Sequence, residues 1–194
     1  MMFVWDDDYR LKKLAKEAHA FLSPSKAAWL NYDEAKMLEV FNNFEAAKRG
    51  TELHDWAAKT INLGIKQQNT KKTLCAYVND AIKYGMKTEQ FLYYSPYCYG
   101  TADSIVWNEK QRILRIHDLK TGVTPAHMEQ LVIYAALFCL QYKDQIPPLG
   151  SFGVELRIYQ MDNIIIHQPT PEEISMVMAK IIGATKLLDS YRNG

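Results

Sequence analysis

Asp103, Asp118 and Lys120 are the residues of this sequence whose types and spacing best suit chemistry. In the β-rich run from Arg112 to Lys120, alternate side chains share a face, so Asp118 and Lys120 lie on the side that is apolar earlier in the run. Burying a carboxylate and an ammonium there costs desolvation free energy, unless the two charges pair with each other or bind a ligand. A structural ion pair at a strand end is the alternative interpretation of this tripeptide taken alone.

Asp103 lies in the preceding β-rich run, and the short polar segment between the two runs predicts a hairpin. The hairpin would bring Asp103 and Asp118 side by side near one end of the paired strands. Two neighbouring carboxylates repel each other unless a cation lies between them. Hard oxygen ligands with open positions suit Mg²⁺ or Mn²⁺, so the pattern predicts a divalent metal site.

The composition predicts a folded protein with one domain. The chain has 194 residues, of which 48% are hydrophobic and 23% charged, with a formal net charge of +1 that neither supports nor forbids binding to nucleic acid. No apolar stretch reaches membrane-spanning length, and the acidic residues 6–8 do not suit a secretory signal, so we expect a cytoplasmic protein without a membrane segment. The three cysteines, Cys75, Cys98 and Cys139, are interpreted as free thiols. Their number excludes a four-cysteine iron–sulfur cluster.

The first part of the chain has helical patterns. Ser23 is expected as an N-cap with Pro24 at the first helical position, and residues 34–48 continue with helical spacing. Gly50 is expected to interrupt this helix and Thr51 to cap a new one. A further helix is expected from about residue 70 to 84, ending at Gly85.

The second part of the chain alternates strands with helices. Three β-rich runs between residues 88 and 120 predict an antiparallel meander. A helix is expected from Thr124 to about Tyr142, then two strands around the turn residues Asp162 and Asn163, and a last helix opened by the capping box at residues 170–173. We therefore expect an α/β fold with a mixed central sheet, as one domain over residues 1–194. Residues 1–87 would form a helical N-terminal portion that narrows access to the site, and residues 88–194 the catalytic core.

Four motifs in this order resemble the PD-(D/E)XK nuclease superfamily, in particular its RecB-like exonuclease branch of phage recombination and mitochondrial genome maintenance enzymes. The motifs cover about half of the chain and are "RGTELH" at 49–54, "GTAD" at 100–103, "DLKTG" at 118–122 and "QLVIY" at 130–134. The resemblance implies a restriction-endonuclease-like core. Cluster-bearing members that act in CRISPR adaptation share these motifs, but they need cysteines that this chain lacks.

The resemblance also implies roles for individual residues. His54, Asp103, Asp118 and the backbone carbonyl of Leu119 would ligate Mg²⁺ or Mn²⁺. Lys120 would orient and help deprotonate the attacking water or stabilise charge on the phosphate. Gln130 and Tyr134, four apart on one helix face, would hold the substrate backbone or the site water.

Several of these residues have a plainer interpretation. His54 could be a half-buried packing residue, and Tyr134 a core aromatic with a bonded hydroxyl group. Glu52 is left out of the predicted site because two residues on a helix are about 200° apart. Glu89 is interpreted as a surface residue, with an acid that supports the metal ligands as the alternative. His117 has no motif around it.

The function expected from these patterns is a Mg²⁺- or Mn²⁺-dependent DNA exonuclease of phage origin that acts in recombination, repair or replication within the bacterial host cytoplasm. The alternatives are a structure-specific endonuclease with the same site and a degenerate nuclease fold used for DNA binding or assembly. The expected partners are DNA and a phage recombination or single-strand-binding protein.

Overall fold

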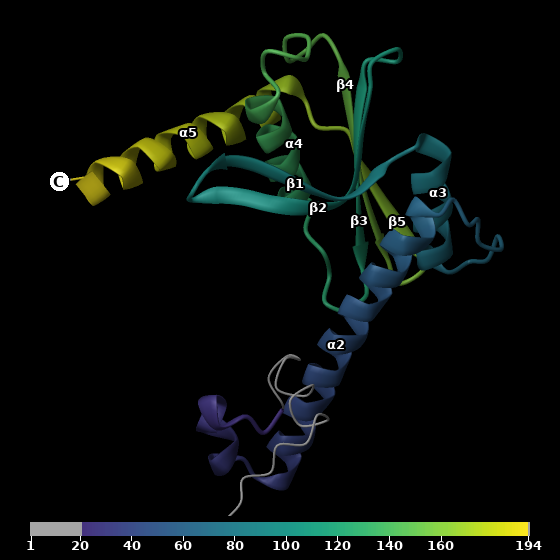
Figure 1. Cartoon of the computed structure of the whole chain (residues 1–194), viewed down its shortest axis with the longest axis vertical. Coiled ribbons are helices and arrows are strands. Elements are labelled where there is room, and N and C mark those ends of the chain that lie inside the picture. Colours follow the sequence, from purple (N-terminus) through teal and green to yellow (C-terminus); the bar gives the residue numbers. More distant parts are fainter. Residues whose placement is uncertain (1–20, 194) are drawn as a thin grey trace, which may run out of the picture. The chain divides into compact units, whose positions relative to one another are not determined.

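The computed structural model describes residues 21–193 (Figure 1). The acidic residues 6–8 and the helical interpretation of residues 1–20 lie outside this range. The chain divides into two compact units, Met1–Arg49 and Gly50–Gly194. This division falls inside a helix.

In the first unit, a 3-10 helix, η1 (Pro24–Asn31), follows Ser23. The α-helix α2 (Glu34–Asn62) then begins after Asp33, whose Oδ1 accepts the backbone N–H of Lys36 at 2.8 Å. Helix α2 continues through residue 50, so the predicted interruption at Gly50 is wrong. A single glycine costs a helix interior about 1 kcal/mol, which is too little to end a helix whose last turns are packed into a core.

Helix α3 (Thr73–Tyr84) ends as the sequence predicts, although it begins three residues later than expected. Gly85 has a φ of 63°, and its N–H bonds to the last turn of the helix. Glycine adopts this left-handed conformation without the steric cost of a side chain. The chain then enters the sheet at Lys87.

The sheet has five strands in the order β1-β2-β3-β4-β5. The first three form the predicted antiparallel meander, β4 pairs parallel with β3, and β5 pairs antiparallel with β4. The mixed sheet confirms the α/β class. The strands are β1 (Lys87–Ser95), β2 (Cys98–Asn108), β3 (Ile113–Lys120), β4 (Gly153–Gln160) and β5 (Asn163–His167).

Helix α4 (Glu129–Gln141) makes the crossover from β3 to β4. The prediction that it begins at Thr124 is wrong, because residues 121–128 form a loop. The side chain of Gln160 holds this loop: its Nε2 donates to the carbonyls of Gly122 and Thr124 at 2.7 Å each, and its Oε1 accepts the N–H of Ala126 at 3.1 Å. These backbone groups are therefore satisfied without a helix.

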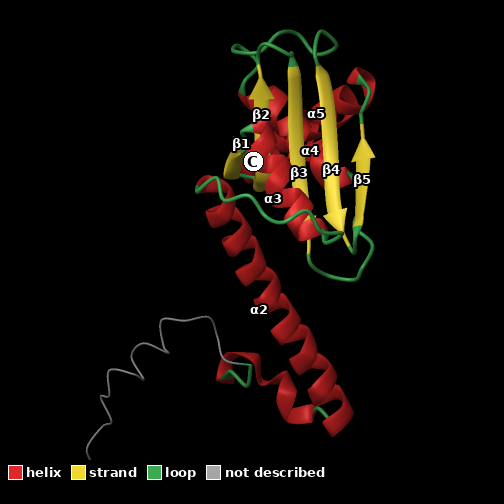
Figure 2. Cartoon of the chain, turned by 90° about the vertical axis from the view of Figure 1, so that its right-hand side faces the viewer, coloured by secondary structure: helices red, strands yellow, loops and turns green. Residues whose placement is uncertain are grey.

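Helices cover both faces of the sheet (Figure 2). Helices α4 and α5 (Pro171–Asn193) pack on one face, over a core that includes Leu114, Ile116 and Leu156. Helix α3 and the end of α2 pack on the other face. The side chains of this second core include Ala57, Ile61, Val78, Ala81, Leu119 and Tyr159.

Helix α5 begins with half of the predicted capping box. Thr170 Oγ1 accepts the N–H of Glu173 at 3.2 Å, but the Glu173 carboxylate pairs with His167 at 3.0 Å and does not reach back to the cap. Among the described helices, none combines the length and apolar character that a membrane crossing needs.

Candidate metal centre

Strand β2 leaves β3 at Asp103. The last pair of the β2–β3 ladder at this end is Ser104 with His117, so Asp103 lies just beyond it. Its carboxylate Oδ2 accepts the backbone N–H of Leu119 at 2.9 Å. A side chain thus takes the N–H that a continuing ladder would have used, and Asp103 is fixed against β3 close to Asp118.

Glu89 lies across from Asp103 on β1. The flanking pairs, Thr88 with Ser104 and Gln90 with Ala102, put the two acids opposite each other. Glu89 has a φ of 49°, an unusual conformation for a residue with a side chain. The strands exchange faces at this position, since Ala102 packs in the core under α4 whereas Val106 packs in the core under α3.

The bend gathers three groups that can bind a metal ion. One ligand atom each from His54, Glu89 and Asp103 lies within 4.8 Å of the others. His54 Nδ1 is 3.4 Å from Asp103 Oδ2. An imidazole and two carboxylates suit a divalent cation such as Mn²⁺ or Mg²⁺, with positions left for water or other oxygen ligands.

Asp118 and Lys120 form a second group, on the side of α4. Lys120 Nζ lies 3.0 Å from Asp118 Oδ2 and donates to Gln130 Oε1 at 2.9 Å. Gln130 Nε2 contacts the Tyr134 hydroxyl at 3.5 Å, and that hydroxyl donates to the Thr101 carbonyl at 2.7 Å. One chain of polar contacts therefore links the end of β3, helix α4 and strand β2.

The two groups influence each other electrostatically. Burial, reinforced by the negative charge of Asp118, raises the pKa of Asp103 to about 6, while the Leu119 N–H and His54 act in the opposite direction. Crowded acids that resist ionisation are typical of sites that hold a cation.

The buried Asp118 carboxylate supplies a further test of fit to a metal ion. Its Oδ2 is close to the Lys120 ammonium but accepts no well-directed hydrogen bond from any residue that the structure describes. Asp118 is 3% exposed, so water has little access to donate the missing hydrogen bond to this oxygen. An oxygen with spare acceptor capacity, beside Asp103, fits a hard divalent cation.

The structure thus arranges the predicted residues in two clusters. His54 and Asp103 come together, and so do Asp118, Lys120 and Gln130, whereas Asp118 is not a member of the 4.8 Å group. Leu119 is seen as a donor through its N–H; the role predicted for its carbonyl stays a prediction. Tyr134 is half-buried and bonded to Thr101, an arrangement close to the plainer interpretation of this residue.

Glu89 is the residue that sequence reasoning placed outside the site. Counting back evenly from the turn at residues 96–97, where Ser95 pairs with Cys98, would place position 90 opposite position 103. The register shift between Tyr93 and Ser95 brings Glu89 there instead, and residue types alone do not predict that shift. The left-handed backbone at Glu89, which points to a local distortion of β1, could not be read from residue types.

His117, one residue before Asp118, belongs to a buried polar network on the α3 face. Its Nδ1 contacts the Tyr159 hydroxyl at 3.2 Å, and that hydroxyl donates to Asp80 Oδ2 at 2.7 Å. Burial, with help from the positive charges of Arg157 and Arg115, lowers the pKa of His117 to about 3. A neutral, packed imidazole here supports the core.

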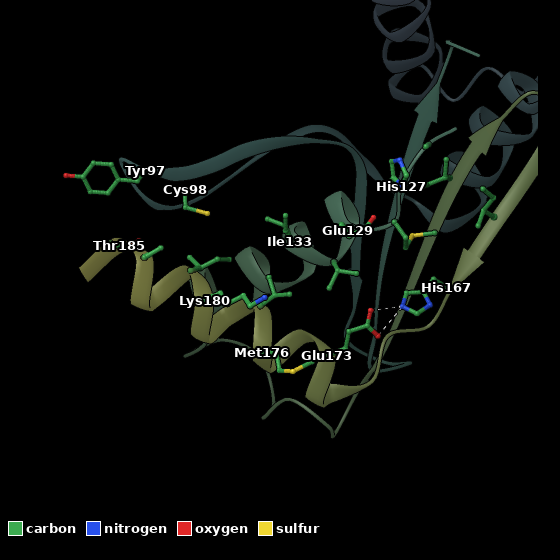
Figure 3. Close-up of a pocket in the computed structure, with 18 of the residues that line it drawn as sticks. Tyr97, Cys98, His127, Glu129, Ile133, His167, Glu173, Met176, Lys180 and Thr185 are labelled. Carbon is green, nitrogen blue, oxygen red and sulfur yellow. Dashed lines mark hydrogen bonds and ion pairs between the residues drawn. The ribbon is translucent and has the colours of Figure 1, made fainter. Parts of the chain in front are cut away.

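An apolar groove lies in the second unit, apart from the two polar clusters. It has a volume of about 980 Å³ and is walled mainly by apolar side chains of α4, α5 and β5, with the His167–Glu173 pair at one side (Figure 3). None of the residues of the two polar clusters lines it. The candidate chemistry therefore lies at the bend of β1 and β2 and not in this groove.

Comparisons of this chain with protein-family models, with curated proteins and with solved structures find no match.

Proposed function

We propose that this chain is a metal-dependent nuclease that hydrolyses DNA phosphodiester bonds. The observation that carries the proposal is the juxtaposition of a His54–Glu89–Asp103 cluster, at the bend of β1 and β2, with an Asp118–Lys120 pair at the end of β3. Acidic ligands with a lysine beside them are the groups that phosphodiester hydrolysis needs: anionic oxygens to hold a cation and a positive charge for the phosphate.

The residues have distinct roles in this proposal. His54, Glu89, Asp103 and Asp118 would hold Mg²⁺ or Mn²⁺. When bound, such an ion polarises a phosphoryl oxygen and lowers the pKa of water for in-line attack. Lys120 orients the water or stabilises the negative charge that develops on the phosphate, and Gln130 holds the Lys120 ammonium in place.

Exonuclease action is the favoured form of this activity. It is supported by the four RecB-like motifs, which run in the expected order along the chain. A structure-specific endonuclease would use the same groups, and it remains the second candidate. A degenerate fold kept for DNA binding is disfavoured because both acids and Lys120 are present.

The test is incubation of the purified chain with linear and covalently closed circular DNA, each single- and double-stranded, with Mg²⁺, Mn²⁺, Ca²⁺ or EDTA. Linear DNA should disappear into short products with Mg²⁺ or Mn²⁺, while Ca²⁺ binds and supports little turnover. Undiminished cleavage in EDTA would refute the metal centre. Rapid nicking of circles would favour the endonuclease.

A further inference from the structure

Three exposed aromatic rings lie together on the β1–β2 hairpin. Phe91, Tyr93 and Tyr99 are 49%, 42% and 59% exposed. The ring centroids of Tyr93 and Tyr99 are 6.3 Å apart with planes 22° from parallel, and Phe91 lies 6.4 Å from Tyr93 and 5.7 Å from Tyr99. Large apolar rings left this open on a surface are typical of binding sites.

The rings share the face of the hairpin that points away from the α4 core. Leu92 and Ala102 pack into that core, so the odd-numbered residues of both strands lie on the opposite face. Figure 1 shows the hairpin turning away from the direction of β3 and running beside α4. One face of the hairpin is therefore covered, and the face with the rings is not.

This open face leads into the acid cluster. Tyr93 pairs with Tyr99 and Phe91 with Thr101, and the next position on this face pairs Glu89 with Asp103. Two residues along a strand span about 7 Å. The nearest ring is thus one strand repeat from the acids, and the others lie further from the cluster along the same face.

The chemistry of the hairpin favours stacking over ion pairing. Residues 90–102 contain no Asp, Glu, Lys or Arg, so this surface offers flat rings and hydroxyl groups without a fixed charge. Bases stack on such rings whatever their sequence. They can do so only where they are unpaired, because the faces of bases inside a duplex are already stacked.

We propose that Phe91, Tyr93 and Tyr99 form a stacking platform for the unpaired bases of single-stranded DNA next to the metal centre. This inference rests on the proposed nuclease function and names its substrate: a single strand, or the unpaired end of a duplex. The platform holds two or three bases while a neighbouring phosphodiester lies at the acid cluster. Cross-strand aromatic pairs also stabilise hairpins, and the experiment separates that contribution from binding.

The experiment measures binding of a fluorescent oligothymidylate to the full chain in Ca²⁺. Loss of one stacked base contact costs about five- to 150-fold in affinity, so Tyr99→Ala should weaken binding within this range. Tyr99→Phe keeps the ring and should bind within about threefold of the unchanged protein. Tyr191→Ala removes an exposed ring on α5, 87% exposed, and is the matched control that should not matter.

An abasic strand of the same length provides the sharper comparison. It keeps the phosphates and lacks the bases, so it should bind the unchanged protein and Tyr99→Ala equally. Equal losses for intact and abasic strands would show a folding defect in place of stacking and would overturn the platform. So would a Tyr99→Ala protein that binds the intact strand as tightly as the control.

The two proposals fail in different ways. If the platform is wrong, Tyr99→Ala cleaves single strands in Mn²⁺ with an unchanged KM. If the nuclease proposal is wrong, no substrate is cleaved, whereas ring-dependent binding of the intact strand can still be measured. If both hold, Tyr99→Ala raises KM for single-stranded DNA, and Mn²⁺ affinity without DNA stays unchanged.

Discussion

At the scale of single residues, the candidate site is a small region in which negative charge is concentrated under partial burial. Asp103 and Asp118 lie near each other, and Lys120 offsets one of them through its contact with Asp118. Lys120 is also held by Gln130, so its position does not depend on Asp118 alone. This arrangement separates the effects that substitution of each residue should have.

Asp118→Ala and Lys120→Ala should differ in their effect on metal binding. Removing Asp118 takes away an anionic oxygen donor, so Mn²⁺ affinity and cleavage should fall together. Removing Lys120 leaves the Asp118 carboxylate without its cation, so metal binding should persist or improve while the rate drops about a hundredfold or more. Calorimetry with Mn²⁺ and cleavage assays measure both. A Lys120→Ala protein with near-normal cleavage would mean that the pair is structural.

Glu89→Gln should weaken Mn²⁺ binding, because Glu89 lies in the cluster with His54 and Asp103. Loss of one carboxylate charge from a hard-metal site should cost about tenfold or more in affinity. Glu52→Gln is the matched control, since Glu52 is an exposed acid on α2 outside this cluster. Isothermal titration of both variants decides the point, and equal affinities would remove Glu89 from the site.

Asp103→Asn should change the pH dependence of stability in metal-free buffer. The unfolded carboxyl ionises near 3.8 and the folded one near 6, so the native protein loses stability as pH rises between these values. The loss is absent below about pH 4 and complete above about pH 6. Asparagine carries no charge, and the variant should gain on the order of 1 to 3 kcal/mol relative to the unchanged protein at pH 7.

Urea unfolding at pH 4.5, 5.5 and 7 measures this difference. The gain of Asp103→Asn should be small at pH 4.5 and largest at pH 7. A gain that is the same at all three pH values would show that ionisation of Asp103 is not its source. The same variant should bind Mn²⁺ less tightly, which would separate stability from function.

At the scale of elements, local patterns predicted the strands better than the helix boundaries. The alternating burial of residues 113–116 at the start of β3 and the turn residues before it are properties of adjacent positions, and the meander follows from them. The start of α4 was predicted wrongly because Gln160, which is distant in sequence, forms hydrogen bonds with the backbone groups of the loop at 122–126. Hydrogen bonds between distant residues cannot be read from periodicity.

The residues of the candidate site also divide into those that local patterns predicted and one that they did not. Asp118 and Lys120 were predicted because their spacing follows the strand repeat, and Asp103 because a short hairpin lays its strand beside theirs. Glu89 was placed outside the site because its position depends on the bend of two strands together, with a left-handed residue in β1. The hairpin packs on α4, which is distant in the sequence, and no short window of sequence contains that information.

Gly50 does not interrupt α2, but its lack of a side chain leaves room for Thr121. A Cβ at position 50 would lie 2.8 Å from Thr121 Oγ1, in the residue directly after Lys120. Alanine for glycine inside a helix normally adds about 0.5–1 kcal/mol of stability. Gly50→Ala should instead give no gain or a loss, and it should lower cleavage by displacing the end of β3.

The double variant Gly50→Ala with Thr121→Ala tests the contact. Removal of the hydroxyl should restore the helical gain, so the two substitutions should be non-additive in thermal unfolding. Thr121→Ala alone is the control for loss of the hydroxyl group. Additive effects would show that the helix and the loop do not meet as described.

At the scale of the whole molecule, the charge balance limits how the proposed DNA substrate could be held. The formal net charge is +1, so bulk attraction of the chain for a polyanion is weak. Under the proposed function, affinity for DNA would have to come from local groups: a cation at the acid cluster, Lys120, and the rings of the hairpin. Binding that rests on stacking loses less affinity in salt than binding through many lysines and arginines.

Every residue of the candidate site and of the stacking platform belongs to the second unit, Gly50–Gly194, which also contains the complete sheet and both cores. A fragment of residues 45–194 keeps one helical turn before Gly50, so His54 remains inside a helix that is packed through Ala57 and Ile61. This fragment should unfold cooperatively and bind Mn²⁺ within about threefold of the full chain. The full-length Asp103→Asn variant provides the reference for a damaged metal site. A fragment that folds but binds Mn²⁺ as weakly as that variant would show that the metal centre needs residues of the first unit, and the site as assembled from the second unit would then be incomplete.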